Sequence, residues 1–164
     1  MVRRMFFLLW ATCLMAIGGS AQAQCQYSVK QPAQMRACAI LGNVQARRDY
    51  AIYMAESEDL SLIGESNRQW LADLANEGDP RAERAMAMLA LSGKFGEKNE
   101  TEALAWMENA AAHDDAKAQY QLAQWLNAGF AGRKDPEAAK KWLTAAATNG
   151  NSEAQYRLGD SLAS

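Results

Sequence analysis

Three tryptophans recur at a constant interval, and this spacing restricts the fold more than any other feature of the sequence. Trp70, Trp106 and Trp142 lie 36 residues apart. Small residues keep the same register: Ala82, Ala118 and Ala154 align with one another, and Ala110-Ala111 aligns with Ala146-Ala147. A fixed period of this length, without insertions, is typical of a solenoid of stacked helical units. The period therefore predicts a repeat protein.

Each period contains two helical segments separated by helix-breaking residues. Residues 118–128 carry apolar side chains at helical spacing, and the glycines within 129–132 end that helix. Asp135 and Pro136 then begin the second helix, because Asp caps free backbone N–H groups and Pro has none to leave unpaired. That helix ends at Gly150, and no stretch of the chain alternates for long with the period of a β-strand. The predicted fold class is all-α.

The period divides most of the chain into successive repeats. Residues 46–81 form a degenerate repeat, and residues 82–117 and 118–153 form two clearer ones. Residues 154–164 begin a fourth, which we expect to be a capping helix; an unfinished edge that attracts a partner is the alternative. A single helix pair cannot bury its apolar face alone, so stability is expected to come from the stacking of neighbours.

The best-defined period resembles a known family. From Ala118 the chain reads AQYQLAQWLNAG and then DPEAAKKWLTAAATNGNSEAQYRLGD, which is similar to the Sel-one-like repeat (SLR), a relative of the tetratricopeptide repeat. Residues 82–117 fit more loosely, with Arg84 where the family places an aromatic residue. Residues 46–81 keep little of the pattern beyond Trp70.

The resemblance implies a right-handed superhelix of antiparallel helix pairs. It also implies a non-enzymatic scaffold or adaptor, because family members act mainly in protein assembly and signalling, and exported bacterial members often serve the cell envelope. Some cysteine-rich relatives are described as binding or slowly hydrolysing β-lactams. A weak hydrolase directed at β-lactams or peptidoglycan is therefore an alternative.

The first 23 residues have the pattern of a secretory signal peptide. Two arginines precede the apolar run of residues 5–17, and the small residues Ala21 and Ala23 precede the expected cleavage site. A membrane anchor is the alternative, but a bilayer-spanning helix needs about 20 apolar residues and this run is shorter. We expect a periplasmic or secreted protein that begins at Gln24 and has no stable membrane insertion.

Two cysteines, Cys25 and Cys38, would remain in the processed chain. They belong to an N-terminal segment, residues 24–45, that precedes the repeat domain of residues 46–164. An oxidising compartment favours a disulfide between them. Two free thiols are the alternative.

The processed chain would be mildly acidic. Without Arg3 and Arg4 it carries 15 basic and 19 acidic residues, a net charge of −4. This balance argues against nucleic acid and anionic membranes as partners, because both attract clustered positive charge.

A stripe of side chains on the first helix of each repeat remains after the packing positions are removed. The predicted groove residues are Tyr53, Met88, Leu89, Gln121, Gln124 and Trp125. First helices line the concave side of tetratricopeptide-like solenoids, and Met and aromatic side chains suit a protein surface. We therefore expect this stripe to bind an extended or helical segment of a protein partner. Packing against a neighbouring helix is the alternative, and stacking of Trp125 and Tyr53 on a sugar suggests a peptidoglycan- or polysaccharide-binding protein.

Residue types that support catalysis or metal binding are sparse. His113 is the one histidine, and it falls near the end of a second helix, where a solvated side chain is expected. With two cysteines expected to be bridged, no zinc-ligand set of the usual spacing remains. The motifs of serine hydrolases, zinc peptidases and phosphate-binding loops are absent from the sequence. We therefore expect no cofactor, no metal and no enzymatic activity.

Overall fold

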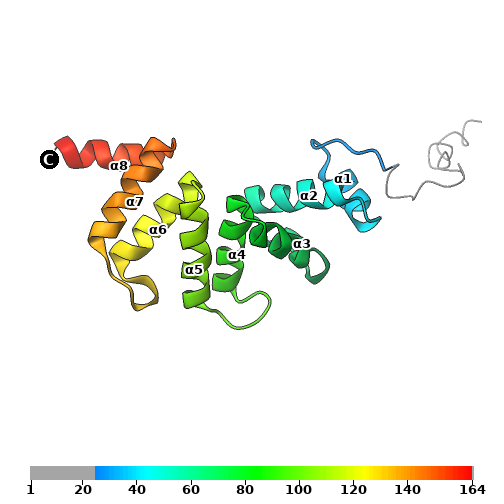
Figure 1. Ribbon diagram of the computed structural model, residues 1–164, viewed down its shortest axis with the longest axis horizontal. Coiled ribbons are helices and arrows are strands. Elements are labelled where there is room, and N and C mark those ends of the chain that lie inside the picture. The colour runs from blue at the N-terminus through cyan, green and yellow to red at the C-terminus, as the bar shows by residue number, and fades with distance from the viewer. Residues whose placement is uncertain (1–24, 164) are drawn as a thin grey trace, which may run out of the picture.

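The computed structural model describes residues 25–163, and the regular structure of this part is helical throughout (Figure 1). Its α-helices are α1 (Pro32–Ile40), α2 (Val44–Ser57), α3 (Glu65–Asn76), α4 (Pro80–Ser92), α5 (Glu100–Ala112), α6 (Ala116–Ala128), α7 (Pro136–Thr148) and α8 (Ser152–Ala163). Two 3-10 turns, η2 (Leu60–Leu62) and η3 (Phe130–Gly132), follow α2 and α6. No strand occurs among these residues, so the all-α prediction is confirmed.

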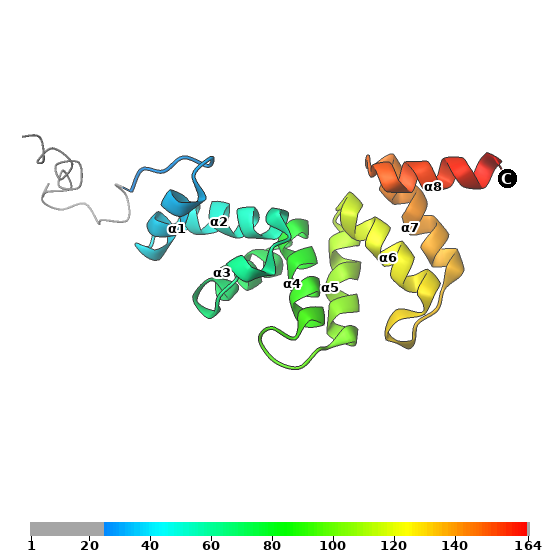
Figure 2. The same ribbon diagram turned by 180° about the vertical axis from the view of Figure 1, so that it is seen from behind.

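The helices stack into an elongated solenoid, with α1 and α8 at opposite ends (Figure 1, Figure 2). Each α-helix packs against the next one along the chain, and α2 also packs against α4. The helix pairs are α2–α3, α4–α5 and α6–α7, and the first helix of each is α2, α4 or α6. This is the predicted solenoid of helix pairs.

The turn between one pair and the next repeats with the period of the sequence. Helices α1, α3, α5 and α7 end 36 residues apart, and α2, α4, α6 and α8 begin 36 residues apart. In each turn, two residues past the helix end, the backbone is left-handed, at Gly42, Gly78, Asp114 and Gly150. Three of the four are glycine, which adopts positive φ without a Cβ clash. Asp114 adopts a φ of 63° although it is not glycine.

The residue after each left-handed position caps the next helix. Asn43, Asp79, Asp115 and Asn151 each accept a hydrogen bond from a backbone N–H of the first helical turn, which would otherwise lack a partner. Each of these residues also donates its own N–H to a carbonyl in the last turn of the preceding helix. One short turn therefore ends one helix and begins the next, which explains why its length does not vary.

Helix α1 lies inside the segment 24–45, which was predicted to precede the repeats. It nevertheless ends 36 residues before α3 does, so it occupies the place of a second helix. The position equivalent to Trp70 is Gln34, and the position equivalent to Leu74 is Cys38. Without the tryptophan, the periodic pattern of residue types does not reach this helix.

The tryptophans occupy equivalent positions on second helices and pack between units. All three are half-buried. Trp106 packs against the buried cluster of α1–α4 and also against that of α4–α7. Trp142 packs against the second of these clusters. Trp70 packs against the first cluster and against a smaller one around Cys38.

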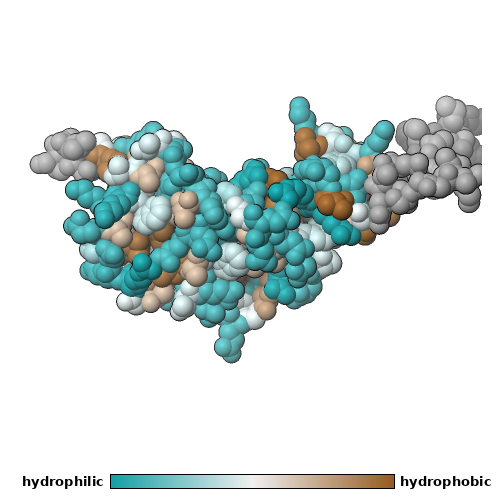
Figure 3. Space-filling view, viewed as in Figure 1, coloured by the Kyte–Doolittle hydropathy of each residue, from teal (hydrophilic) through white to brown (hydrophobic). Residues whose placement is uncertain are grey.

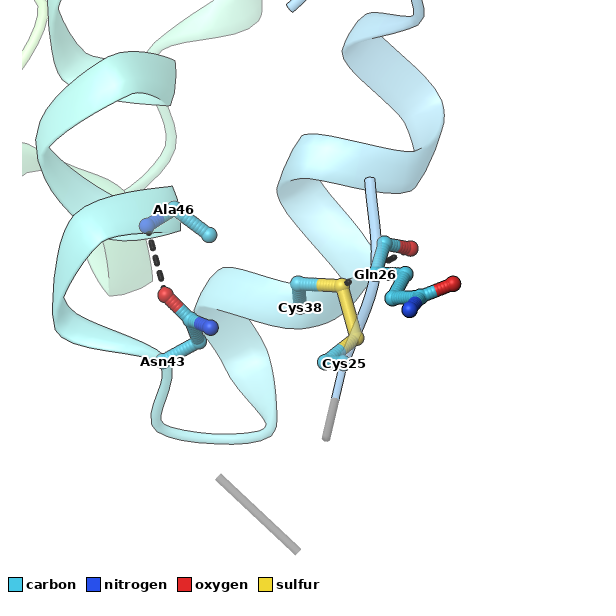
Figure 4. Close-up of a disulfide and its surroundings, with 5 residues drawn as sticks. All are labelled: Cys25, Gln26, Cys38, Asn43 and Ala46. Carbon is cyan, nitrogen blue, oxygen red and sulfur yellow. Dashed lines mark hydrogen bonds between the residues drawn. A yellow bond between two sulfur atoms is a disulfide. The ribbon is translucent and has the colours of Figure 1, made fainter. Parts of the chain in front are cut away.

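A disulfide joins Cys25 to Cys38 and holds the segment before α1 against that helix (Figure 4). Tyr27 strengthens this attachment, because its hydroxyl donates a 2.5 Å hydrogen bond to Asp49 on α2. None of the helices in residues 25–163 combines the length and apolar character needed to cross a membrane. The predicted signal peptide, residues 1–23, lies outside the described residues.

Candidate functional site

A cavity of about 130 Å³ opens between the first helices of the three pairs. We call it the first-helix cavity. It is lined by Met54 and Ala55 of α2, Glu58 just after α2, Leu60 of η2, Ile63, Arg84, Ala85 and Met88 of α4, Met107 of α5, and Lys117 and Gln121 of α6. It therefore unites segments that lie more than sixty positions apart in the sequence.

The floor of the first-helix cavity is apolar and rich in methionine. Met54, Ile63 and Met107 are almost fully buried, whereas Met88 is 40% exposed. Methionine side chains are flexible and polarisable, so they adapt to differently shaped apolar groups. This floor can accept an apolar side chain without requiring one fixed shape.

The rim of the cavity is a network of ion pairs. Arg84 is buried; its Nε lies 3.3 Å from Asp115 and its guanidinium also lies 3.3 Å from Glu58. Lys117 donates a 2.5 Å hydrogen bond to the same Glu58 oxygen. This hydrogen bond is the main cause that lowers the pKa of Glu58; partial burial opposes it, and attraction to both cations adds to it. The rim is charged but internally neutralised.

This network connects three first helices, and the residue spacing in the sequence does not predict it. Glu58 follows the end of α2, Arg84 lies on α4, and Lys117 lies on α6. The available signal was Arg84 itself, a cation where the resemblance expects an aromatic residue. A buried guanidinium requires acceptors, and Asp115 supplies one of them from the next turn.

The predicted groove residues are not all brought together. Met88 and Gln121 line the first-helix cavity. Gln124 is half-buried and accepts a 3.5 Å hydrogen bond from Gln121. Tyr53 is half-buried and stacks on Tyr50, with ring centroids 6.0 Å apart.

Two further members of the predicted groove are packed inside the protein. Leu89 belongs to the buried cluster of α1–α4. Trp125 is 9% exposed and stacks on Phe130, with ring centroids 4.4 Å apart. Neither side chain offers a partner much surface, so neither is available to a partner as predicted.

His113 interacts with a buried carboxylate. Its Nδ1 lies 2.8 Å from Glu83, which is 3% exposed, whereas the histidine itself is half-exposed. Among the described residues, no group of three or more His, Cys, Asp or Glu side chains is arranged to hold a metal ion.

Comparison with known proteins places this architecture in a family. The model of the Sel1 repeat matches residues 80–115, 116–151 and 152–163, which together make up half of the chain. The chain belongs to the Sel1 repeat family. Sel1 repeat proteins generally act in protein–protein interaction, and the family is typically non-enzymatic. No curated protein matches the chain at a significant level.

Solved Sel1 repeat structures are similar to this chain. A Sel1 repeat protein from Oxalobacter formigenes superposes with a TM-score of 0.61 at 30% identity, covering 78% of this chain and 96% of that one. A protective antigen of uropathogenic Escherichia coli with an SLR fold gives 0.61 at 25% identity, covering 80% and 28% respectively. Cysteine rich protein B of Helicobacter pylori gives 0.57 at 18% identity, covering 68% and 92%, and supports the fold alone.

The Sel1 matches begin where α4 begins. The boundaries fall at the turns between pairs, two residues before those assigned from the sequence at residues 82 and 118. The pair α2–α3 lies before the first match, although α2 keeps the 36-residue spacing.

Proposed function

We propose that this chain is an exported, non-enzymatic Sel1 repeat scaffold whose first-helix cavity binds one side chain of an extended or helical segment of a protein partner. One observation carries the proposal: an apolar cavity opens between the first helices, and Met88 stands exposed in its lining. An exposed methionine beside buried ones suits a surface that a partner covers.

The size and charge of the cavity define the side chain that it accepts. A dry, apolar protein cavity of about 150 Å³ binds a benzene ring, so about 130 Å³ suits one aromatic ring or branched aliphatic group. Arg84 and Lys117 already pair with carboxylates of the chain itself. An uncharged apolar anchor is therefore favoured over an acidic one.

Export is supported by the N-terminal part of the chain. The Cys25–Cys38 disulfide is typical of an oxidising compartment, and the first 23 residues have the pattern of a signal peptide. We propose a periplasmic or secreted location and a role in the cell envelope.

Affinity capture from the native cell envelope tests the proposal. Met88→Glu places a charge in the mouth of the cavity, and Ala105→Glu places the same charge on an exposed position of α5. We expect the first variant to lose the captured partner and the second to retain it, with unchanged circular dichroism for both. Equal capture by both variants would contradict the cavity as the binding site.

Methionine-methyl NMR locates the contact independently. Five methionines lie beyond the predicted leader; Met54, Met88 and Met107 line the cavity, whereas Met35 and Met86 do not. Adding the captured segment should shift the resonances of the three lining methyl groups and leave the other two in place. Shifts confined to Met35 or Met86 would place the partner elsewhere.

The carbohydrate-binding alternative loses part of its support. It relied on exposed stacking by Trp125 and Tyr53, but Trp125 is buried against Phe130 and Tyr53 lies against Tyr50. Trp125 therefore offers a sugar little surface, and Tyr53 is half-buried.

A further inference from the structure

The turn between α1 and α2 carries three large aliphatic side chains that are exposed to solvent. Ile40, Leu41 and Val44 are 63%, 57% and 75% exposed, and we call them the N-terminal tip. Figure 3 shows hydrophobic residues at this end of a largely hydrophilic face. The other large hydrophobic residues with comparable exposure among residues 25–160 are Val29, Met88 and Tyr156. Clustered apolar residues mark interaction surfaces more often than scattered ones.

Helix packing does not require aliphatic side chains at the tip. The chain contains three further copies of the same turn, in which the equivalent residues can be compared directly. They are Asn76, Glu77 and Pro80; Ala112, His113 and Ala116; and Thr148, Asn149 and Ser152. All of these residues are polar or small, and the three turns keep the same backbone hydrogen bonds. The aliphatic residues are therefore a feature of the first turn alone.

Charge is distributed unevenly around the tip. Residues 25–48 contain four basic residues and no acidic one, whereas residues 49–164 contain 11 basic and 19 acidic residues. The mild overall acidity thus conceals a basic N-terminal segment, although Asp73 and Glu77 of α3 lie beside its Val44 and Arg48. The expectation drawn from net charge, that anionic membranes are unsuitable partners, does not apply to this end.

Cations lie one helical turn behind the tip on both helices. Arg36 precedes Ile40 by four residues in α1, and Arg48 follows Val44 by four residues in α2, so each arginine shares a helix face with a tip residue. Arg48 pairs with Glu77 at a half-exposed position. Among the described residues, Arg36 makes no ion pair, and neither does Lys30, the neighbour of exposed Val29.

We propose that the N-terminal tip docks the solenoid on an anionic phospholipid surface. The aliphatic side chains enter the interface between headgroups and acyl chains, and Arg36 lies about 6 Å back along the helix, within reach of the phosphates. The disulfide beside this turn (Figure 4) holds α1 in place, so the tip is presented by a fixed backbone. This contact is peripheral, because no described helix could span a membrane, and it leaves the first-helix cavity of α2, α4 and α6 for a separate partner.

Vesicle flotation tests this inference with a variant copied from the protein itself. The triple variant Ile40→Thr, Leu41→Asn, Val44→Ser gives the tip the residues of the α7–α8 turn, which the fold already tolerates. Tyr156→Ser is the matched control, since it removes an equally exposed apolar side chain at the far end. Each form is purified from the expressing cells without further processing. It is then mixed with phosphatidylcholine vesicles that contain or lack phosphatidylglycerol.

We expect the wild type and Tyr156→Ser to float with phosphatidylglycerol vesicles and to dissociate at high salt. The affinity of the triple variant for these vesicles should fall at least about tenfold, because apolar burial is lost. Arg36→Gln should bind about fivefold more weakly, as expected for one cation at an anionic surface. Equal binding by the wild type and the triple variant would overturn the proposal. So would binding that ignores phosphatidylglycerol, or a tip that captures a protein while vesicles stay unbound.

Discussion

Removal of the tryptophans one at a time should reveal how the helix pairs are coupled. Trp106 packs against two buried clusters and Trp142 packs against one of them. Truncation of a fully buried tryptophan to alanine costs about 3–5 kcal/mol. Both indoles are half-buried, so we expect Trp142→Ala to lower the free energy of unfolding by about 2 kcal/mol and Trp106→Ala to lower it by about 3 kcal/mol.

Urea unfolding followed by far-UV circular dichroism measures both the free energy and the cooperativity. In a solenoid, stability is a sum of unit terms and interface terms. Trp106→Ala weakens an interface in the middle of the stack, so its transition should also broaden, whereas Trp142→Ala should keep a single sharp transition. The reasoning is refuted if Trp142→Ala costs as much as Trp106→Ala, or if both transitions remain equally sharp.

Three further predictions follow from the turns and the N-terminal segment. Asp114→Gly should stabilise the chain by about 0.5 kcal/mol in thermal or urea unfolding, because relief of a left-handed aspartate outweighs the loss of its two hydrogen bonds; a destabilised variant would contradict this. Replacing Cys25 and Cys38 by serine removes the disulfide-closed loop and should lower the free energy of unfolding by about 3 kcal/mol. A reducing agent should destabilise the wild type but not this variant. Burial, followed by the hydrogen bond and charge of Asp49, raises the pKa of Tyr27 from 10.0 to about 12. Because this pKa is raised in the folded chain, its contribution to stability is complete below pH 10 and is lost as the pH rises toward 12. Phenolate absorbance should show one late-titrating tyrosine that Tyr27→Phe removes, and its absence from the wild-type titration would argue against the contact.

The helical solenoid could be predicted because its signals are local and repeated. Asp135 caps α7 at the position where the sequence predicted a helix start. The tryptophans occupy equivalent places because a period of 36 residues returns each position to the same face. Repetition thus turned weak single-residue preferences into a firm prediction of the fold.

The face of each helix could not be predicted as well as its existence. Successive residues of an α-helix point about 100° apart, so a stripe displaced by one position faces a different neighbour. On α4, Arg84, Ala85 and Met88 line the cavity, whereas the predicted stripe continued to Leu89, which is buried. How far one helix pair turns relative to the next depends on side-chain packing, which the residue spacing does not report.

Long-range ion pairs were missed for a related reason. Arg84 and Lys117 lie in different helix pairs and Glu58 follows α2, so nothing in their sequence positions joins them before the pairs are stacked. Helix α1 escaped notice because Gln34 replaces the marker tryptophan, while its turn geometry, centred on Gly42, matches that of the other turns.

The uniform turn has a consequence for how such a chain can change over time. Because every joint presents the same backbone hydrogen bonds to the next helix, a gene segment encoding 36 residues can be duplicated or lost between any two joints without creating a new kind of junction. The number of cavities between first helices would grow or shrink with each event. Such an event would not change the aliphatic residues of the N-terminal tip or the final helix α8. The length of the solenoid and the residues at its two ends can therefore evolve separately.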